Sequence, residues 1–408
     1  MLKKIILHET LLNLVSLRFL LILGLFVLMF FGGLFVNIDS YKTRLKEYTE
    51  VAAVTGPYTM AIPPNPLSAI AEGTEKSSAV SVATNMMLSS FVVKPLGESN
   101  ASLRLSTFES LDMNFVVKVL LSMAAILITF ASVSGERFAG TLKLASVSGA
   151  SRKNLILGKL IASFICLAVP MVICTIISCL ILATNNMLST STDIVRVCLF
   201  VLFSMVYILF FLLVGLFISI ATKRPQESLI TGVLCWLVLV FILPALVPQV
   251  SQFFVTLPSA RAMEQARAER LSQTLFETSK YQGNWAAMTE QIQTGHDAEW
   301  ERSRNQIVNY SKVYRWIAML SPSDIYNNAS VDIMGNGVQN AIHANKAILQ
   351  HKDNLVKNPR DSNFVFNRID FASDSIVALL AMFILCIETI VLLLFTYRKF
   401  MRLDLREG

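Results

Sequence analysis

The sequence predicts an all-α polytopic membrane protein with six transmembrane helices, a mainly helical extracytoplasmic domain and a smaller mixed extracytoplasmic segment. Of its 408 residues, 54% are hydrophobic and only 15% are charged. A soluble core of this size could not bury so much apolar surface, so a bilayer is the natural solvent for the chain. Six apolar runs are each long enough to cross about 30 Å of hydrocarbon at roughly 1.5 Å per residue.

The six expected spans cover residues 17–36, 115–133, 155–183, 194–221, 228–248 and 375–397. The first run is too long for a signal peptide, and Phe31-Gly32-Gly33 is followed by Leu34-Phe35-Val36 instead of a small-residue cleavage site. We therefore expect this span to be retained. An even number of crossings places both termini on the same side of the membrane.

The distribution of Lys and Arg indicates which side that is. The short polar segments carry these residues at more than twice the density of the two long ones, 38–114 and 249–372. Because short cytoplasmic loops are enriched in positive charge, we expect the short segments to be cytoplasmic. They comprise an N-terminal segment with an amphipathic helix at 1–16, a loop at 134–154, a short connection at 222–228 and a tail at 398–408. The net charge of +7 follows from this topology, so we expect no nucleic-acid partner.

The two extracytoplasmic pieces differ in character. In the smaller piece, 37–114, three prolines at 63, 64 and 66 forbid a regular helix, and the alternation in residues 77–87 favours a strand. The larger piece, 249–374, has the composition of a helical domain. Its expected helices cover residues 258–280, residues 297–319, a segment that starts at 321, and a segment that follows Gly337.

Cysteine and histidine usage argues against a metal centre. All six cysteines lie in the predicted spans, where a small buried hydrophobe is the favoured interpretation. The four histidines, His8, His296, His343 and His351, show no close ligand spacing. We therefore expect no metal site and no disulfide framework.

The loop between the second and third spans, SGERFAGTLKLASVSGASRKNLILGK at 134–159, is the most polar short stretch in the first half of the chain. Phe138, Leu142 and Ala145 fall on one helical face, whereas Glu136, Arg137, Thr141 and Lys143 point elsewhere. We expect Gly149 to end this turn in a left-handed conformation and Ser151 to cap the next helix.

This pattern predicts a helix, a sharp elbow and a second helix. Such an elbow can transmit force from a soluble partner, or it can be a positively charged loop that only anchors the topology. A phosphate-loop interpretation of Gly158-Lys159 fails, because the preceding glycine is Gly149 and Leu160 stands where Ser or Thr should bind magnesium. We find no nucleotide site in the sequence.

The same stretch resembles the signature segment of ABC-2 type transporter permeases. The matching positions are Gly135, Glu136, Gly140, Thr141, Leu142, Ser151, Arg152, Gly158 and Lys159. Three further stretches resemble the larger branch of that family, which is grouped with the permease component for multicopper enzyme maturation: HETLLNLVSLRFLL, PPNPLSAIAEG and MLSPSDIYNNASVDIMGNG.

The resemblance implies a dimeric permease in a bacterial cytoplasmic (inner) membrane. It also implies a separate ATPase subunit, with its ATP and Mg, docked on the loop after the second span. The chain itself would bind no cofactor. The residues expected to couple to the ATPase are Glu136, Arg137, Gly140, Thr141, Leu142, Ser151, Arg152 and Lys159. The resemblance favours force transmission by this loop, but it indicates neither a substrate nor copper.

Two other features complete the expectation. In the N-terminal helix, Leu2, Ile5, Ile6 and Leu12 share a face opposite Glu9, as an interfacial lipid-binding helix requires. Glu388 lies near the middle of the last span, where a carboxyl must face protein or water. It either lines the translocation path or forms a hydrogen bond to a neighbouring helix.

We therefore expect a permease subunit of an ATP-driven exporter. It would work with a second copy or a paralogue and with an extracytoplasmic protein partner. The alternative is a scaffold that transports nothing and uses the ATPase to act on that extracytoplasmic partner. An intramembrane enzyme is disfavoured, because the spans lack paired aspartates, a Ser and Lys pair, and zinc ligands.

Overall fold

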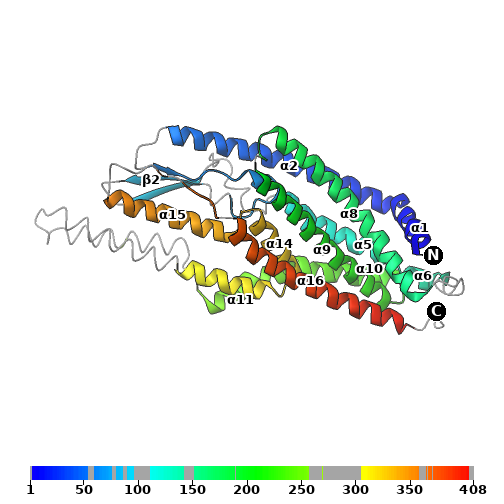
Figure 1. Ribbon diagram of the computed structural model, residues 1–408. Coiled ribbons are helices and arrows are strands. Elements are labelled where there is room, and N and C mark those ends of the chain that lie inside the picture. Colours follow the sequence, from blue (N-terminus) through cyan, green and yellow to red (C-terminus); the bar gives the residue numbers. More distant parts are fainter. Residues whose placement is uncertain are drawn as a thin grey trace, which may run out of the picture.

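The computed structural model describes residues 2–53, 59–75, 80–85, 90–95, 111–141, 151–188, 190–256, 269, 305–357, 364, 366–369 and 371–403. Long helices run side by side in one elongated bundle (Figure 1). The start of α1 (Leu2–Val15) and the end of α16 (Phe371–Met401) lie at the same end of this bundle. We call it the terminal end, and the opposite one the far end.

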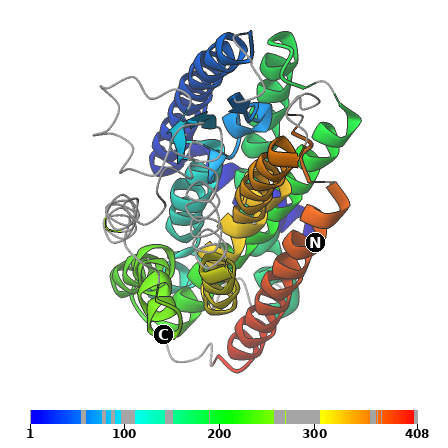
Figure 2. The same ribbon diagram turned by 90° about the vertical axis from the view of Figure 1, so that its left-hand side faces the viewer.

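Six helices in the described part of the chain are long and apolar enough to cross a membrane, which confirms the predicted number. They are Leu17–Ala53, Met113–Phe138, Arg152–Thr184, Ser191–Ala221, Pro225–Phe254 and Ile376–Met401. Seen along the bundle from the far end, the first (α2, blue) and the last (α16, red) lie on opposite sides (Figure 2).

The helix of the first span continues well past residue 36. α2 runs without interruption from Leu17 to Ala53, so the start of the segment expected at 37–114 is helical. Residues 34–53 include neither glycine nor proline, and several of them are good helix formers. α2 therefore reaches beyond the hydrocarbon at the far end.

The second and fifth spans each contain a short π-helical stretch. The second consists of α4 (Met113–Phe115), η3 (Val116–Leu121), α5 (Ser122–Thr129) and α6 (Ser134–Phe138). The fifth consists of α10 (Pro225–Leu237), η4 (Val238–Ile242) and α11 (Leu243–Phe254). A π turn leaves carbonyls that neighbours can bind. The Tyr207 hydroxyl donates to the Lys118 carbonyl over 3.0 Å, and the Ser323 hydroxyl donates to the Leu239 carbonyl over 2.7 Å.

The central helix of the bundle is α9 (Ser191–Ala221), whose aromatic side chains form much of the buried core. It packs closely against α5, because Gly215 leaves no side chain between the two helices. A Cβ at this position would lie 2.1 Å from the Thr129 hydroxyl oxygen. Glycine is therefore a packing requirement at position 215.

The N-terminal helix packs along α8 (Arg152–Thr184) rather than standing free. Gly158 provides the space for this contact, since a Cβ there would lie 2.7 Å from Ile5. The Cys166 thiol lies 3.9 Å from the Thr10 carbonyl further along the same pair of helices. α1 ends at a turn where the Ser16 hydroxyl accepts from the Phe19 N–H and starts α2.

The smaller mixed segment forms a three-stranded antiparallel sheet at the far end. β1 (Thr59–Ala61) pairs with β2 (Val80–Asn85), which pairs with β3 (Ser90–Pro95). The strand predicted over 77–87 corresponds to β2. Between β1 and β2 the proline-rich stretch forms only a 3-10 turn, η1 (Pro66–Ala69).

The larger segment folds partly back into the bundle. Residues 305–318 are helical, and α14 (Pro322–Ile333) and α15 (Val338–Lys357) follow, as the patterns from 297 onward predict. α14 is buried between α9 and α16. The rings of Tyr326 and Tyr207 stack with centroids 4.3 Å apart, and the Tyr326 hydroxyl lies 2.9 Å from the Ser204 hydroxyl. Of the helix expected over 258–280, only Glu269 is among the described residues.

Candidate functional site

The loop after the second span begins with the short helix α6, which is fixed firmly to the bundle. The Ser219 hydroxyl, near the end of α9, accepts from the backbone N–H groups of Val133 and Ser134, both over 3.0 Å. The Ser228 hydroxyl in α10 donates to the Phe130 carbonyl over 2.7 Å. α6 is thus held by the terminal ends of two other spans.

α6 carries Glu136 and Arg137 and ends at Phe138. Gly140 then adopts a φ of +72°, a conformation that glycine accommodates without strain. The Thr141 hydroxyl donates to the Glu136 carbonyl over 3.3 Å and closes this turn. Of the predicted apolar face formed by Phe138, Leu142 and Ala145, only Phe138 is among the described residues, and it is the last residue of α6.

The Phe138 side chain is 70% exposed at this turn. A large aromatic group exposed on a charged turn is a natural contact point for another protein. Leu142 and the elbow expected at Gly149 lie outside the described residues.

On the other side of the loop, Ser151 caps α8 as predicted. Its hydroxyl accepts from the Asn154 N–H over 3.3 Å. Arg152, the next residue, donates from Nη1 to the carbonyls of Met401 and Leu403 over 3.1 Å and 2.9 Å. A cation is well placed there, because the last carbonyls of α16 lack partners within the helix. The start of α8 is thereby tied to the end of α16.

Lys159 joins the loop to the N-terminal helix. Its Nζ lies 2.6 Å from Oε1 of Glu136 in α6 and 2.6 Å from Oε1 of Glu9 in α1. The Lys159 side chain is only 5% exposed, whereas Glu9 and Glu136 are 18% and 30% exposed. One buried ammonium thus holds two carboxylates from different elements. We call these three residues the Lys159 triad.

Glu9 lies on a different face of α1 from the one that the sequence predicts. The sequence pattern places Glu9 opposite Ile5, but in the structure Ile5 and Glu9 both face α8. They are one helical turn apart, so they share a side of α1. The apolar face of α1 is instead exposed, with Leu7 64% and Leu11 52% accessible.

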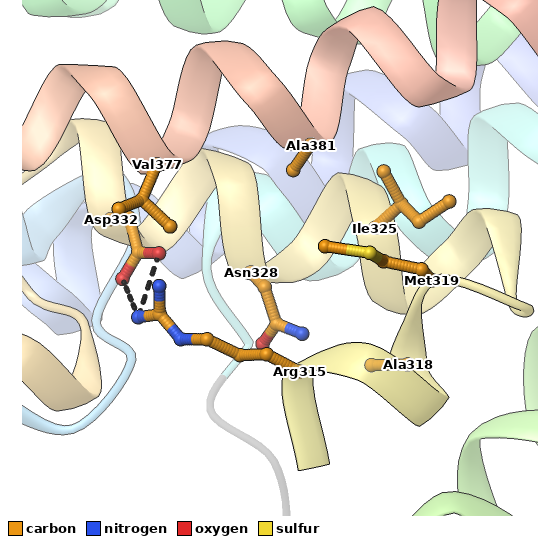
Figure 3. A pocket seen from close by; sticks show the side chains of 8 residues that line it. All are labelled: Arg315, Ala318, Met319, Ile325, Asn328, Asp332, Val377 and Ala381. Atoms are coloured by element: carbon orange, nitrogen blue, oxygen red, sulfur yellow. Dashed lines mark hydrogen bonds and ion pairs between the residues drawn. The ribbon is translucent and has the colours of Figure 1, made fainter. Parts of the chain in front are cut away.

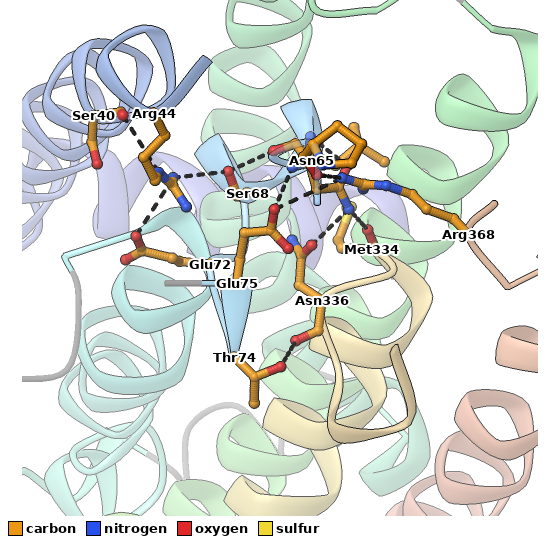
Figure 4. Close-up of polar contacts among 12 residues, drawn as sticks. Ser40, Arg44, Asn65, Ser68, Glu72, Thr74, Glu75, Met334, Asn336 and Arg368 are labelled. Carbon is orange, nitrogen blue, oxygen red and sulfur yellow. Dashed lines mark hydrogen bonds and ion pairs between the residues drawn. The ribbon is translucent and has the colours of Figure 1, made fainter. Parts of the chain in front are cut away.

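A second polar cluster lies at the far end and contains two of the stretches singled out in the sequence (Figure 4). The Asn65 side-chain amide donates to the Asn336 amide oxygen over 2.6 Å and to the Met334 carbonyl over 2.9 Å. The Asn336 amide donates to the Ala71 carbonyl over 2.5 Å. PPNPLSAIAEG and the end of SPSDIYNNASVDIMGNG are thus held against each other.

Charged residues connect this far-end cluster to the spans. Arg44, on the extension of α2, lies 3.7 Å from Glu72 and donates to the Ser68 hydroxyl over 3.2 Å. Arg368, just before α16, lies 3.8 Å from Glu75. Burial raises the pKa of Glu75, an effect that the Arg368 guanidinium and the Asn65 N–H partly offset. Burial also lowers the pKa of Arg368.

The family model described as "ABC-2 family transporter protein" matches residues 4–405. The chain belongs to the ABC-2 transporter family. The match includes the Lys159 triad and the far-end cluster. No curated protein matches the chain. The expected sub-branch stays a prediction.

In this ABC-2 protein the described members of the predicted coupling set make different contacts. Glu136 and Lys159 are in direct contact, and Thr141 closes the turn beside them. Ser151 instead caps α8, and Arg152 ties the start of α8 to the end of α16. Glu388 lies in α16, half-buried, and its Oε2 has no hydrogen-bond partner among the described residues.

Sequence reasoning did not find Glu9, Ser219 or Ser228. Glu9 could have been found, because a carboxylate in an apolar N-terminal helix beside lipid needs a partner. Ser219 and Ser228 carry no comparable signal in the sequence, since small hydroxyl residues are common in membrane helices. Among the described residues, no cluster of His, Cys, Asp or Glu could hold a metal ion.

Proposed function

We propose that this chain is the permease subunit of an ATP-binding cassette exporter in a bacterial cytoplasmic membrane. A separate ATPase subunit binds ATP and Mg and docks on the 134–154 loop at the terminal end. A second copy of the chain, or a paralogous permease, completes the transporter. This chain contributes no nucleotide or cofactor site.

The Lys159 triad is the observation that carries the proposal. A loop that only anchored topology would need positive charge but no buried ion pairs to two other elements. Here Glu136 of the loop is held 2.6 Å from a lysine that is itself held by Glu9. Breaking a buried pair is costly, so a displacement of α6 moves α8 and α1 with it.

The proposed mechanism follows from these attachments. ATP binding draws the two ATPase subunits together and displaces α6 through contacts at Phe138 and Arg137. Ser219 and Ser228 carry the displacement to α9 and α10, and Lys159 carries it to α8 and α1. The bundle then changes its access from one side of the membrane to the other.

The charge distribution supports the assignment of the terminal end to the cytoplasm. Lys and Arg are concentrated in the short segments that connect the spans at this end. Positively charged short loops are retained on the cytoplasmic side during insertion.

Reconstitution with a candidate ABC ATPase subunit from the same organism tests the function. The pair should show ATP hydrolysis that a transported solute stimulates. Glu136→Gln should reduce the stimulated rate while the ATPase alone keeps its basal rate. An ATPase that neither binds the chain nor changes its rate with it would contradict the proposal.

A second candidate function is a scaffold that transports nothing and transmits force to an extracytoplasmic protein. The continuity of α2 favours it: this helix follows α1, which carries Glu9 of the Lys159 triad, and it extends past Arg44, which contacts Glu72 in the far-end cluster. Stimulation of the ATPase by an extracytoplasmic protein, but by no solute, would select the scaffold over the exporter.

Glu388 is the residue we propose to line the translocation path or a helix seam. A carboxyl in the last span, with one oxygen lacking a hydrogen bond in the described structure, is costly unless it meets solute or water. Glu388→Gln keeps the size and removes the charge, whereas Glu388→Leu removes both. Unchanged transport in both variants, at normal expression, would leave only the packing role.

A further inference from the structure

A polar cavity of about 190 Å³ lies at the far end, beside the far-end cluster. Three parts of the chain form it: the region of η1, the first turns of α9, and the segment from the end of α14 to the start of α16. Six of its lining residues have polar or charged side chains: Asn65, Thr192, Asp193, Arg196, Asn340 and Arg368. A water molecule in the liquid occupies about 30 Å³, so the cavity has room for a small solute.

The cavity lies where the fourth span leaves the bilayer. α9 has 31 residues and is about 46 Å long, whereas the hydrocarbon is about 30 Å thick. With the hydrocarbon centred on α9, Arg196 lies at its far-end edge, because this residue is about 15 Å from the middle of the helix. Thr192 lies about one turn further out and is exposed, and the Arg368 side chain is 32% exposed. Water on the far-end side therefore reaches the lining.

Arg368 presents part of its guanidinium to the cavity. Its Nη2 donates to the Pro63 carbonyl over 2.8 Å and lies 3.8 Å from Oε1 of Glu75. Figure 4 shows this side chain extending toward Asn65 and Glu75. Within the described part of the chain, the hydrogen bond and the ion pair of Arg368 both use Nη2. Nη1 and Nε, the rest of the planar fork of donors, are therefore available to a ligand.

Arg196 lines the same cavity from α9. Its Nη1 donates to the Ile333 carbonyl over 2.7 Å, and its guanidinium carbon lies 5.2 Å from the centroid of the Phe371 ring. Gly335 allows the guanidinium to lie against the turn after α14, since a Cβ there would lie 2.9 Å from Arg196 Nη1. These contacts hold the guanidinium in place, and none of them adds a negative charge.

The charges that line the cavity do not cancel. Arg196 and Arg368 carry two positive charges, and Asp193 carries one negative charge. The Asp193 carboxylate also caps α9, where it accepts from the Thr190 N–H over 3.2 Å. Glu75 contacts Arg368 from outside this lining, and burial raises its pKa, which favours its neutral form. The excess positive charge makes the cavity favourable for an anion.

A smaller cavity nearer the middle of the bundle shows the contrast. It has a volume of about 30 Å³ and lies between the helix at 305–318, α14 and α16 (Figure 3). Its one lining guanidinium, that of Arg315, lies 3.0 Å from Oδ2 and 3.2 Å from Oδ1 of Asp332, which also lines it. The charges of that cavity are balanced within the protein, so nothing about it calls for an anion.

We propose that the 190 Å³ cavity binds a small soluble molecule through a single carboxylate, which Arg196 and Arg368 recognise. Planar guanidinium forks match the geometry of a carboxylate. One excess positive charge suits a monoanion, whereas a phosphate monoester carries about −1.5 to −2 and would be repelled by Asp193. Leu67 and Ile369 also line the cavity and can contact the apolar part of the molecule.

A carboxylate at this place would connect parts of the protein that belong to different spans. Arg196 is on the fourth span, and Arg368 immediately precedes the helix of the sixth. Because such a ligand binds only the folded arrangement, it stabilises the far end. The proposal does not depend on which ATPase or solute the protein uses.

Carbon-13 NMR with the full-length protein tests this site. Butyrate labelled at its carboxyl carbon is titrated with protein in phosphatidylcholine nanodiscs, and empty nanodiscs give the background. Broadening of the carboxyl line reports binding. Unlabelled butyrate should reverse the broadening, whereas butyramide should not, because it has a similar shape without the charge.

Variants assign the binding to the cavity. Arg368→Gln and Arg196→Gln should each weaken butyrate binding by on the order of tenfold, because each removes a charge-assisted hydrogen bond. Lys46→Gln is the matched control: Lys46 is also a cation on the far-end side, but it is 79% exposed and lies 4.0 Å from Glu50. This variant should bind butyrate as wild type does.

Three results would overturn the proposal. Broadening no greater than in empty nanodiscs would mean that the cavity holds only water. Equal binding by wild type and both arginine variants would place the butyrate elsewhere. Phosphatidylglycerol retained in native mass spectra by wild type but not by Arg368→Gln, without butyrate binding, would assign the cavity to a lipid headgroup.

The unaltered chain provides a second test in case the arginine variants do not fold. Phenylglyoxal modifies accessible arginines, and the modified peptides are quantified by mass spectrometry. Butyrate should slow the modification of Arg196 and Arg368 but not that of Arg402, which is exposed at the terminal end. Equal rates at Arg196 and Arg368 with and without butyrate would refute the proposal.

Discussion

Lys159 Nζ lies 2.6 Å from Oε1 of Glu136, although 23 residues of loop and helix separate them in the chain. This ion pair joins the second and third spans. The same ammonium also holds Glu9, so it links the N-terminal helix to α6.

Removing the ammonium should destabilise the terminal end. Lys159→Gln leaves Glu9 and Glu136 close together without a counter-charge. We expect a loss of about 3 kcal/mol in the free energy of unfolding, the lower end for breaking a buried pair, because the carboxylates are partly exposed. Thermal unfolding in detergent measures it. Lys159→Arg keeps the charge and should recover part of the loss. Equal stability of Lys159→Gln and wild type would contradict a structural role for the triad.

The two carboxylates should have separable effects on coupling. Glu9→Gln leaves the bond between Lys159 and Glu136 intact, so the loop stays attached to α8 but not to α1. We expect a partial loss of ATPase-driven transport, smaller than in Glu136→Gln, and a non-additive loss in the double variant. Glu50→Gln is the matched control, because Glu50 and its partner Lys46 are 65% and 79% exposed, 4.0 Å apart. Additive effects of Glu9→Gln and Glu136→Gln would show that the two act independently.

Gly215 should tolerate no side chain. In Gly215→Ala the new Cβ would meet the Thr129 hydroxyl at 2.1 Å and force α5 and α9 apart. We expect a loss of about 1–3 kcal/mol, as for other overpacked cores. Gly24→Ala is the control, since nothing lies within 4 Å of that position. If both variants unfold at the same temperature as wild type, the close contact of α5 and α9 is wrong.

The far-end cluster should weaken as pH rises. Burial raises the pKa of Glu75 above its ordinary value of 4.5, so the folded state binds its proton more tightly than the unfolded state does. The stabilisation is therefore complete below pH 4.5 and is lost as pH rises through the folded-state pKa. Glu75→Gln should flatten this part of the dependence of melting temperature on pH. An unchanged profile in Glu75→Gln would mean that other groups cause it.

The sequence predicted the architecture because apolar length is a strong local signal. Each of the six runs crosses about 30 Å of hydrocarbon, and each lies in one of the six long apolar helices. The cap at Ser151 was predictable for the same reason, since a cap acts within one turn.

Contacts between residues far apart in the chain could not be predicted from local sequence patterns. Glu9 meets Lys159 only because α1 packs along α8. Gly158 allows that packing, but its match to the family signature does not indicate which helix packs against it. The end of α6 at Phe138 was not predicted, because the apolar spacing in the sequence continues past it. The return of α14 into the bundle was hidden by polar residues such as Ser323 and Asn327, which find partners inside the protein.

Photocrosslinking at position 138 tests the central claim most directly. A photoreactive amino acid replaces Phe138, whose side chain is 70% exposed on the proposed docking turn, and Phe253, 89% exposed at the far end, serves as the control position. The account predicts an adduct with an ABC ATPase in cells from position 138 and none from position 253. No ATPase adduct from position 138, or equal adducts from both positions, would contradict the claim that a separate ATPase drives this protein through the loop at the terminal end.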